Sequence, residues 1–252
     1  MSELLLRAGE WEQVTPESAG WSHLFFGVRQ GSFASETGDV EIALVPLGGR
    51  ASVFEGMPWA LYLPRDTTYR VEGDAEVAIC GALCERRREP VLIRPEDVEI
   101  EVRGAGNATR QINHIVKPEF PAERLLVVEV FTPSGNWSSY PPHKHDEDRP
   151  PGEVILEETY YFRTAKPEAF AVQRLYSPRH GLDVTETVRD GDLMLVPYGY
   201  HTTAAAHGYD LYYLNALAGE RRSMASADDP DLAWIRAAWA GLEPDPRVPL
   251  VR

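Results

Sequence analysis

The histidines of this sequence gather in one region. Five of the seven lie between positions 143 and 207, and two of them form the motif His143-Lys144-His145. Residues i and i+2 of an extended strand project from the same face, so His143 and His145 can bind one ion while Lys144 points away. Imidazole suits zinc, manganese, iron, nickel and copper. The motif therefore indicates a metal site.

A carboxylate and a third histidine extend this set. Glu158 opens an aromatic run and continues in register with Tyr160 and Phe162, whereas Glu157 would face the other side of the same strand. His201 follows a proline-glycine turn. Three imidazoles and one carboxylate on the inner face of a barrel leave open positions for substrate. We predict one divalent metal ion, with the ligands His143, His145, Glu158 and His201. Glu157 is the alternative to Glu158 as the carboxylate ligand.

The elements that position these residues are short strands. Twenty glycines and twenty prolines separate runs that are rich in β-branched and aromatic residues. No helical pattern of 10–15 residues alternates with them, so we expect antiparallel sandwiches or barrels, not a parallel fold. The predicted strands span residues 21–28, 40–45, 59–63, 75–80, 125–131, 159–163, 169–176, 192–196 and 211–215.

Two other segments carry distinct signals. Asp228-Asp229-Pro230-Asp231 is a helix start, and an apolar stripe follows it until Gly241, which predicts a C-terminal helix packed on the barrel or on a neighbouring subunit. The polar stretch 101–120 is expected to connect the two halves of the chain.

Charge and cysteine content narrow the possible partners. The 39 acidic residues outnumber the 25 Lys and Arg, giving a formal net charge of −14, which argues against nucleic-acid and anionic-membrane binding. An anionic substrate would therefore need a local positive charge. Cys80 and Cys84 are expected to be buried thiols, and the N-terminal leucines are too few for a signal peptide, so we expect a cytoplasmic protein.

The spacing of the site residues resembles that of metal-binding cupins, in the pattern His143-x-His145, Glu158 and Pro197-x-Gly199-x-His201. The surrounding segments 138–146, 156–162, 196–201 and 207–215 are similar to the 5-deoxy-glucuronate isomerase family of inositol catabolism, which is related to the uronate isomerase of pectin breakdown. Twelve residues separate His145 from Glu158, more than in the general cupin pattern, and this segment must loop out.

This resemblance implies an all-β bicupin with a short C-terminal helix. Residues 1–112 would form a metal-free N-terminal cupin, because that half has no His-x-His motif. Residues 113–252 would form the metal-binding cupin and carry the helix. A homo-oligomer is compatible with this organisation.

The resemblance also implies conversion of 5-deoxy-glucuronate, a small anionic sugar, to 2-deoxy-5-keto-gluconate. A Zn, Mn, Fe or Ni ion would act as a Lewis acid, and a base would move a proton between neighbouring carbons. A hydride shift would need no base. Candidates for the base are Glu157, Glu147, His207 and a tyrosine such as Tyr160.

Arg174 interrupts an apolar strand and has two interpretations. Its guanidinium could bind the substrate carboxylate, or it could lie solvated on the outer face of the barrel.

Two other function classes fit the same ligands. An iron-dependent cupin dioxygenase would use a three-histidine, one-glutamate site with open positions. A non-catalytic sugar-binding cupin would bind its ligand without turnover.

Overall fold

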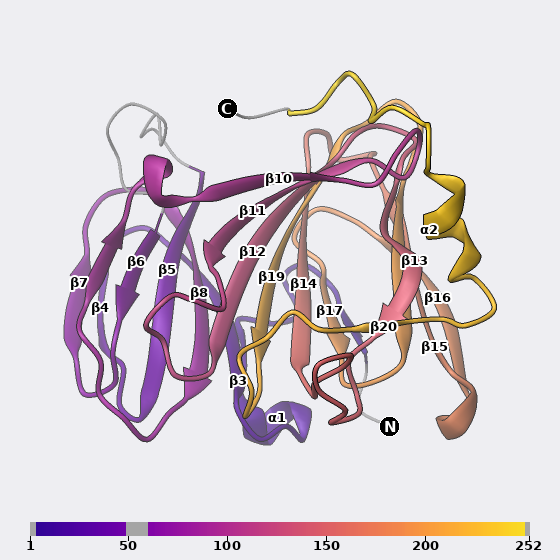
Figure 1. The fold of residues 1–252 in the computed structure, drawn as a ribbon. Coiled ribbons are helices and arrows are strands. Elements are labelled where there is room, and N and C mark those ends of the chain that lie inside the picture. Colours follow the sequence, from indigo (N-terminus) through magenta and orange to yellow (C-terminus); the bar gives the residue numbers. More distant parts are fainter. Residues whose placement is uncertain (1–3, 49–59, 250–252) are drawn as a thin grey trace.

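The computed structural model describes residues 4–48 and 60–249 and is built almost entirely from antiparallel strands. Three large sheets lie face to face. A small two-stranded sheet lies against the six-stranded one (Figure 1). The two α-helices of the described residues, α1 (Pro16–Ala19) and α2 (Trp234–Ala238), are both far too short to cross a membrane.

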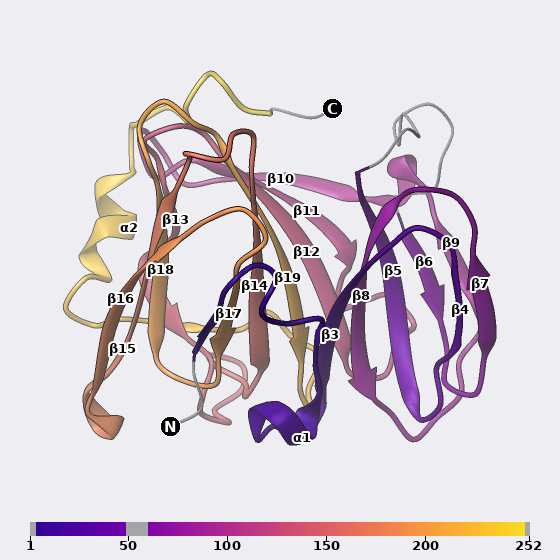
Figure 2. The same ribbon diagram turned by 180° about the vertical axis from the view of Figure 1, so that it is seen from behind.

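The central sheet has seven strands. In spatial order they are β1 (Leu5–Leu6), β17 (Leu193–Val196), β14 (Glu157–Thr164), β19 (Leu211–Ala218), β12 (Leu125–Thr132), β11 (Arg110–Val116) and β10 (Glu99–Arg103). A five-stranded sheet covers one face of it, in the order β16 (Leu182–Val188), β15 (Ala171–Ser177), β18 (Tyr200–Ala205), β13 (Trp137–Lys144) and β20 (Ala227–Asp228). Figure 2 shows these two sheets on one side of the molecule, with α2 outside them.

The N-terminal half covers the opposite face of the central sheet. Its six-stranded sheet has the order β2 (Gln13–Val14), β3 (Leu24–Gln30), β8 (Glu76–Leu83), β5 (Val40–Gly48), β6 (Ala60–Leu63) and β9 (Val91–Ile93). The two-stranded sheet pairs β4 (Phe33–Glu36) with β7 (Thr68–Val71). Short 3-10 turns lie at η1 (Pro95–Asp97) and η2 (Pro178–His180).

Each pair of facing sheets encloses its own hydrophobic core. Leu175, Phe162 and Tyr213 belong to the core between the five- and seven-stranded sheets, which we call the C-terminal barrel. Phe26 and Tyr161 belong to the core between the seven- and six-stranded sheets. The middle of the central sheet is therefore buried on both faces, and alternate residues of β17, β14, β19 and β12 enter different cores.

The all-β class predicted from the sequence is confirmed, and each predicted strand overlaps an observed one. Trp59, at the start of the predicted strand 59–63, lies outside the described residues, whereas β6 covers the rest of that strand. The segment 101–120, however, is not a connector. It contains part of β10 and all of β11, whose residues pair in register from Glu99 with His114 to Arg103 with Arg110. Its polar side chains have partners inside the structure. The polarity of this segment was therefore not evidence for a loop.

The predicted domain boundary and the predicted start of the helix can also be located on the structure. The predicted boundary at residue 112 falls inside β11, and strand pairing changes sheet earlier, between β9 and β10, while β1 crosses over to pair with β17. The C-terminal helix begins only at Trp234. Its predicted cap residues are used elsewhere, because Asp228 lies in β20 and Asp229 accepts a hydrogen bond from Tyr176.

Candidate metal centre

Strand β14 presents its side chains alternately to the two cores. Glu158, Tyr160 and Phe162 face the interior of the C-terminal barrel and are at most 5% exposed, whereas Tyr161 packs in the core shared with the N-terminal half. This is the register expected from the aromatic pattern of the strand. Glu158 therefore lies inside the barrel.

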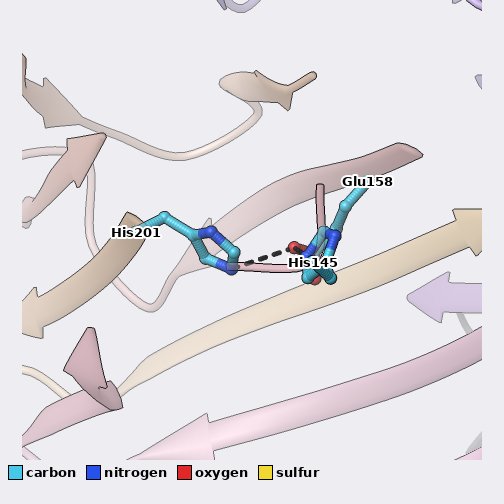
Figure 3. A group of neighbouring side chains, drawn as sticks. All are labelled: His145, Glu158 and His201. Atoms are coloured by element: carbon cyan, nitrogen blue, oxygen red, sulfur yellow. Dashed lines mark hydrogen bonds and ion pairs between the residues drawn. The ribbon is translucent and has the colours of Figure 1, made fainter. Parts of the chain in front are cut away.

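His145, Glu158 and His201 converge at one point (Figure 3). One ligand atom from each lies within 4.8 Å of the others. The Glu158 Oε2 atom is 3.0 Å from His145 Nε2 and 3.2 Å from His201 Nε2. All three side chains are buried. These residues come from the end of β13, from β14 and from β18, so two sheets meet at the cluster.

Hydrogen bonds to backbone carbonyls orient both imidazoles. Nδ1 of His145 lies 2.9 Å from the Leu156 carbonyl, and Nδ1 of His201 lies 3.1 Å from the Gly199 carbonyl. Because a carbonyl only accepts, each Nδ1 donates its proton and each Nε2 presents a lone pair in the neutral ring. His201 Nε2 is buried and has no hydrogen-bond partner in the described part of the chain. Two such lone pairs and a carboxylate fit a divalent cation.

The carboxylate of this cluster is ionised. Burial alone would raise the pKa of Glu158, but its close contacts with the rings of His145 and His201 outweigh it and lower that pKa to about 2. For His145 burial acts to lower the pKa, and the bond to Glu158 overcomes it and raises the pKa. The donor set therefore carries a negative charge suited to a cation.

His143 lies at the edge of this cluster. It pairs directly with His201 across β13 and β18, and the two ring centroids are 4.6 Å apart. Its ring is 6.4 Å from that of His145, and its nitrogens are not among the converging atoms. The structure thus assembles three of the four predicted ligands and places the fourth beside them.

Lys144 points away from the cluster, as the strand pattern predicts. Its ammonium group forms ion pairs with Asp146, with Glu147 at 3.1 Å and with Glu153 at 2.8 Å. The looped segment after His145 is therefore held together by a buried lysine that neutralises part of its acidity. Glu147, one candidate for the base, is engaged in this network and with Arg149.

A group of hydroxyls beside the cluster could not be identified from the sequence. Ser139 Oγ lies 3.0 Å from the Tyr160 hydroxyl, and Ser138 Oγ lies 2.5 Å from that of Tyr213. The Tyr160 ring is 5.8 Å from that of His201. Ser139 has a φ of +50°, which is uncommon for a residue other than glycine and accompanies the irregular pairing of β13 between Ser138 and His143. Strand alternation cannot predict such an irregularity.

Glu157 does not reach the cluster of His145, Glu158 and His201. Its carboxylate accepts hydrogen bonds from the backbone N–H groups of Ser22, His23 and Leu24, at 2.5–3.0 Å. The side chain thus connects β14 to the N-terminal half. Its expected roles as base or alternative ligand are corrected, because alternation along the strand points it to the opposite side from Glu158.

His207 is also remote from the cluster. It is exposed in the turn that follows β18, whereas His201 lies near the start of that strand. The structure therefore does not bring its predicted catalytic side chain to the site.

Arg174 lies on the outer face of the barrel. Leu175, next to it on β15, is fully buried in the barrel core, so Arg174 points outward. Its guanidinium donates two hydrogen bonds to Asp183, at 2.9 and 3.0 Å, and stacks 4.1 Å from the Tyr176 ring centroid. This geometry corrects the interpretation of Arg174 as a carboxylate clamp and matches its solvated alternative.

We therefore expect Arg174→Ala to leave substrate affinity unchanged. An exposed ion pair contributes about 0–1 kcal/mol, so stability should fall by no more than that, and KM should stay within roughly twofold. Steady-state kinetics and thermal unfolding check both values. A large rise in KM with unchanged stability would restore Arg174 as a substrate-binding residue.

Comparison with known proteins identifies the sequence family. The model of the KduI/IolB family matches residues 4–235. The 5-deoxy-glucuronate isomerase of Geobacillus kaustophilus is 43% identical over 250 residues, covering 90% of this chain and 91% of that protein. The Bacillus subtilis enzyme of the same name is 42% identical over 201 residues, covering 78% of this chain and 74% of that protein.

Solved structures agree with this family and with the fold. An IolB-like protein of Salmonella typhimurium LT2 has a TM-score of 0.86 at 35% identity, covering 93% of this chain and 99% of that one. Bacillus subtilis oxalate decarboxylase, which has Mn(II) centres, has a TM-score of 0.53 at 12% identity, covering 90% of this chain and 80% of that one. The second likeness shows the fold alone.

Proposed function

The chain belongs to the KduI/IolB family, and from this premise we propose that it isomerises the aldose 5-deoxy-glucuronate to the ketose 2-deoxy-5-keto-gluconate in inositol catabolism. We propose further that it does so with one divalent metal ion. The ligands would be His145, Glu158 and His201, with His143 as the fourth.

One observation carries the metal part of this proposal. Two imidazoles, each with its Nδ1 bonded to a carbonyl, direct their Nε2 atoms at one carboxylate oxygen inside a barrel. Without a cation, two lone pairs and a negative charge would face each other in a buried site, which is unfavourable. A divalent cation there satisfies all three groups.

A bound divalent cation would supply Lewis acidity toward a carbonyl oxygen of the substrate. The protein's own residues supply orientation. The carbonyls of Leu156 and Gly199 fix the two imidazoles, and Glu158 offsets part of the positive charge.

Tyr160 would act as a hydrogen-bond donor in this site. Burial, together with the charges of Glu158 and Tyr213, raises the pKa of its hydroxyl well above 10. The hydroxyl therefore keeps its proton at neutral pH. We propose that it donates to a substrate oxygen and that Ser139 holds it in place.

Chelation tests the metal and the reaction together. We expect the protein to convert 5-deoxy-glucuronate to the ketose, to lose this activity with a chelator, and to regain it when a divalent metal is restored. In heavy water, proton transfer would place one solvent deuterium on the carbon that was the aldehyde. NMR of the product measures both conversion and incorporation.

The same assay separates the other function classes. Full activity after complete metal removal would contradict the metal assignment. Oxygen consumption with a catechol or thiol substrate would indicate a dioxygenase, and saturable sugar binding without conversion would indicate a binding protein. Conversion without deuterium incorporation would retain the isomerase and indicate either a hydride shift or a proton transfer shielded from solvent.

A further inference from the structure

Arg110 is a buried arginine of β11. It is 3% exposed, and no carboxylate within the described residues lies at ion-pair distance from its guanidinium. Its Nη1 atom donates to the carbonyls of Ala108, at 3.1 Å, and Tyr140, at 3.3 Å. Nε and Nη2 make no hydrogen bond to any residue that the structure describes. A buried charge with unused donors is costly unless a further partner is present.

The position of Arg110 connects it to the metal centre. It lies on β11 two residues from Ile112, which packs in the barrel core with Tyr160 and Tyr213, so Arg110 projects from the same face. Its hydrogen bond to the Tyr140 carbonyl links the guanidinium to β13. Three residues further along that strand is His143.

The neighbouring arginines are already paired, unlike Arg110. Arg103, directly opposite on β10, bonds to Glu101 through two nitrogens at 2.7 and 2.8 Å. Arg236 on α2 bonds to Asp228. Both charges are thus neutralised locally, whereas Arg110 forms no ion pair with any residue that the structure describes.

The positive charge of Arg110 acts on groups beside the cluster. Burial lowers the pKa of Arg110 to about 10, which still leaves it charged at neutral pH. Burial raises the pKa of the Tyr213 hydroxyl beside the cluster, and the charge of Arg110 is among the effects that oppose this rise. Its positive charge therefore extends to the proposed substrate site.

The backbone around the guanidinium is tightly built. Gly104 has a φ of +87°, and a Cβ there would lie 2.1 Å from the Ala108 carbonyl oxygen and 3.0 Å from Arg110 Nη1. Only glycine fits this turn, and the Ala108 carbonyl in turn orients the guanidinium. The remaining nitrogens, Nε and Nη2, form the planar edge that binds carboxylates with two hydrogen bonds.

We propose that Arg110 binds the carboxylate of the sugar-acid substrate. This inference rests on the proposed function, since the carboxylate and the aldehyde are the two ends of the substrate's carbon chain. Arg110 holds the first, which directs the second to the cluster of His145, Glu158 and His201. The positive charge that an anionic ligand requires in this acidic protein is thus supplied inside the barrel.

The test compares a charged with a neutral sugar. Arg110→Gln removes the guanidinium, and Arg110→Lys keeps a charge without the planar fork. Arg174→Gln is the matched control, because it removes a strand arginine that faces outward. Binding of D-glucuronate and of D-glucose to the metal-loaded protein is measured by calorimetry, and KM and kcat are measured with 5-deoxy-glucuronate.

We expect Arg110→Gln to weaken glucuronate binding and raise KM by roughly 10- to 100-fold, with metal content and glucose binding unchanged. Arg110→Lys should fall between it and the wild type, and Arg174→Gln should behave as the wild type. If Arg110→Gln does not fold, the lysine variant alone carries the comparison.

Equal losses for glucuronate and glucose, or no loss in a folded variant, would overturn the proposal. Calorimetry needs no turnover. A chain that prefers glucuronate through Arg110 but converts no substrate would contradict the isomerase function and still support the carboxylate site.

Discussion

Replacing His201 with alanine is expected to abolish both metal binding and turnover. His201 is fully buried, and its Nε2 atom lies 3.2 Å from Glu158 without a hydrogen-bond partner in the described residues. Its removal takes one of the converging ligand atoms and leaves Glu158 and His145. Residues that only support a ligand typically account for about 10- to 100-fold in metal affinity or activity, so loss of a ligand should exceed that.

Metal analysis of the purified variant, together with its steady-state rate, checks this expectation. His180→Ala is the matched control, because His180 is an exposed histidine in the turn after β15. Circular dichroism shows whether the variant keeps its strands. A folded His201→Ala protein with wild-type metal content and rate would show that the cluster is not the metal site.

The second large effect is expected at two adjacent glutamates, for which the same substitution should have different results. Glu158→Gln should lose the metal and the activity while the protein stays folded, because an amide cannot supply the negative charge of the cluster. Glu157→Gln should keep the metal and lose stability. Its carboxylate accepts three backbone hydrogen bonds from residues 22–24, and such charge-assisted bonds contribute about 1.5–3 kcal/mol each.

Thermal unfolding measures the stability of both variants, and metal analysis measures how much metal each one retains. A loss of about 2 kcal/mol corresponds to a decrease in Tm of roughly 4–8 °C for a protein of this size. Each variant is the control for the other, since both change Glu to Gln on one strand. If Glu157→Gln lost its metal and Glu158→Gln did not, the assigned faces of β14 would be reversed.

These predictions depend on information that strand alternation already contains. Because successive side chains of a strand point to opposite faces, the sequence alone placed Glu158 with Tyr160 and set Lys144 apart from His143 and His145. The all-β class follows from short β-branched and aromatic runs between glycines and prolines. The family resemblance followed from the segments around the histidines.

Alternation does not determine which face of a strand is the inner one. Arg174 and Arg110 both interrupt strands, and only the packing of the sheets shows that the first faces outward and the second faces the interior. Arg110 was further concealed because polar residues in β10 and β11 resemble a connector until their buried partners are known.

Contacts between distant segments were the other missing information. Glu157 meets residues 22–24, more than 130 positions earlier in the chain, and Arg110 reaches Tyr140, 30 residues later. The sequence by itself determined the fold class, the residue types of the candidate cluster and the strand face that Glu158 shares with Tyr160, since these follow from local spacing. Only the tertiary structure decided which carboxylate and which arginine face the barrel interior, because that depends on which surfaces of the sheets are buried against each other.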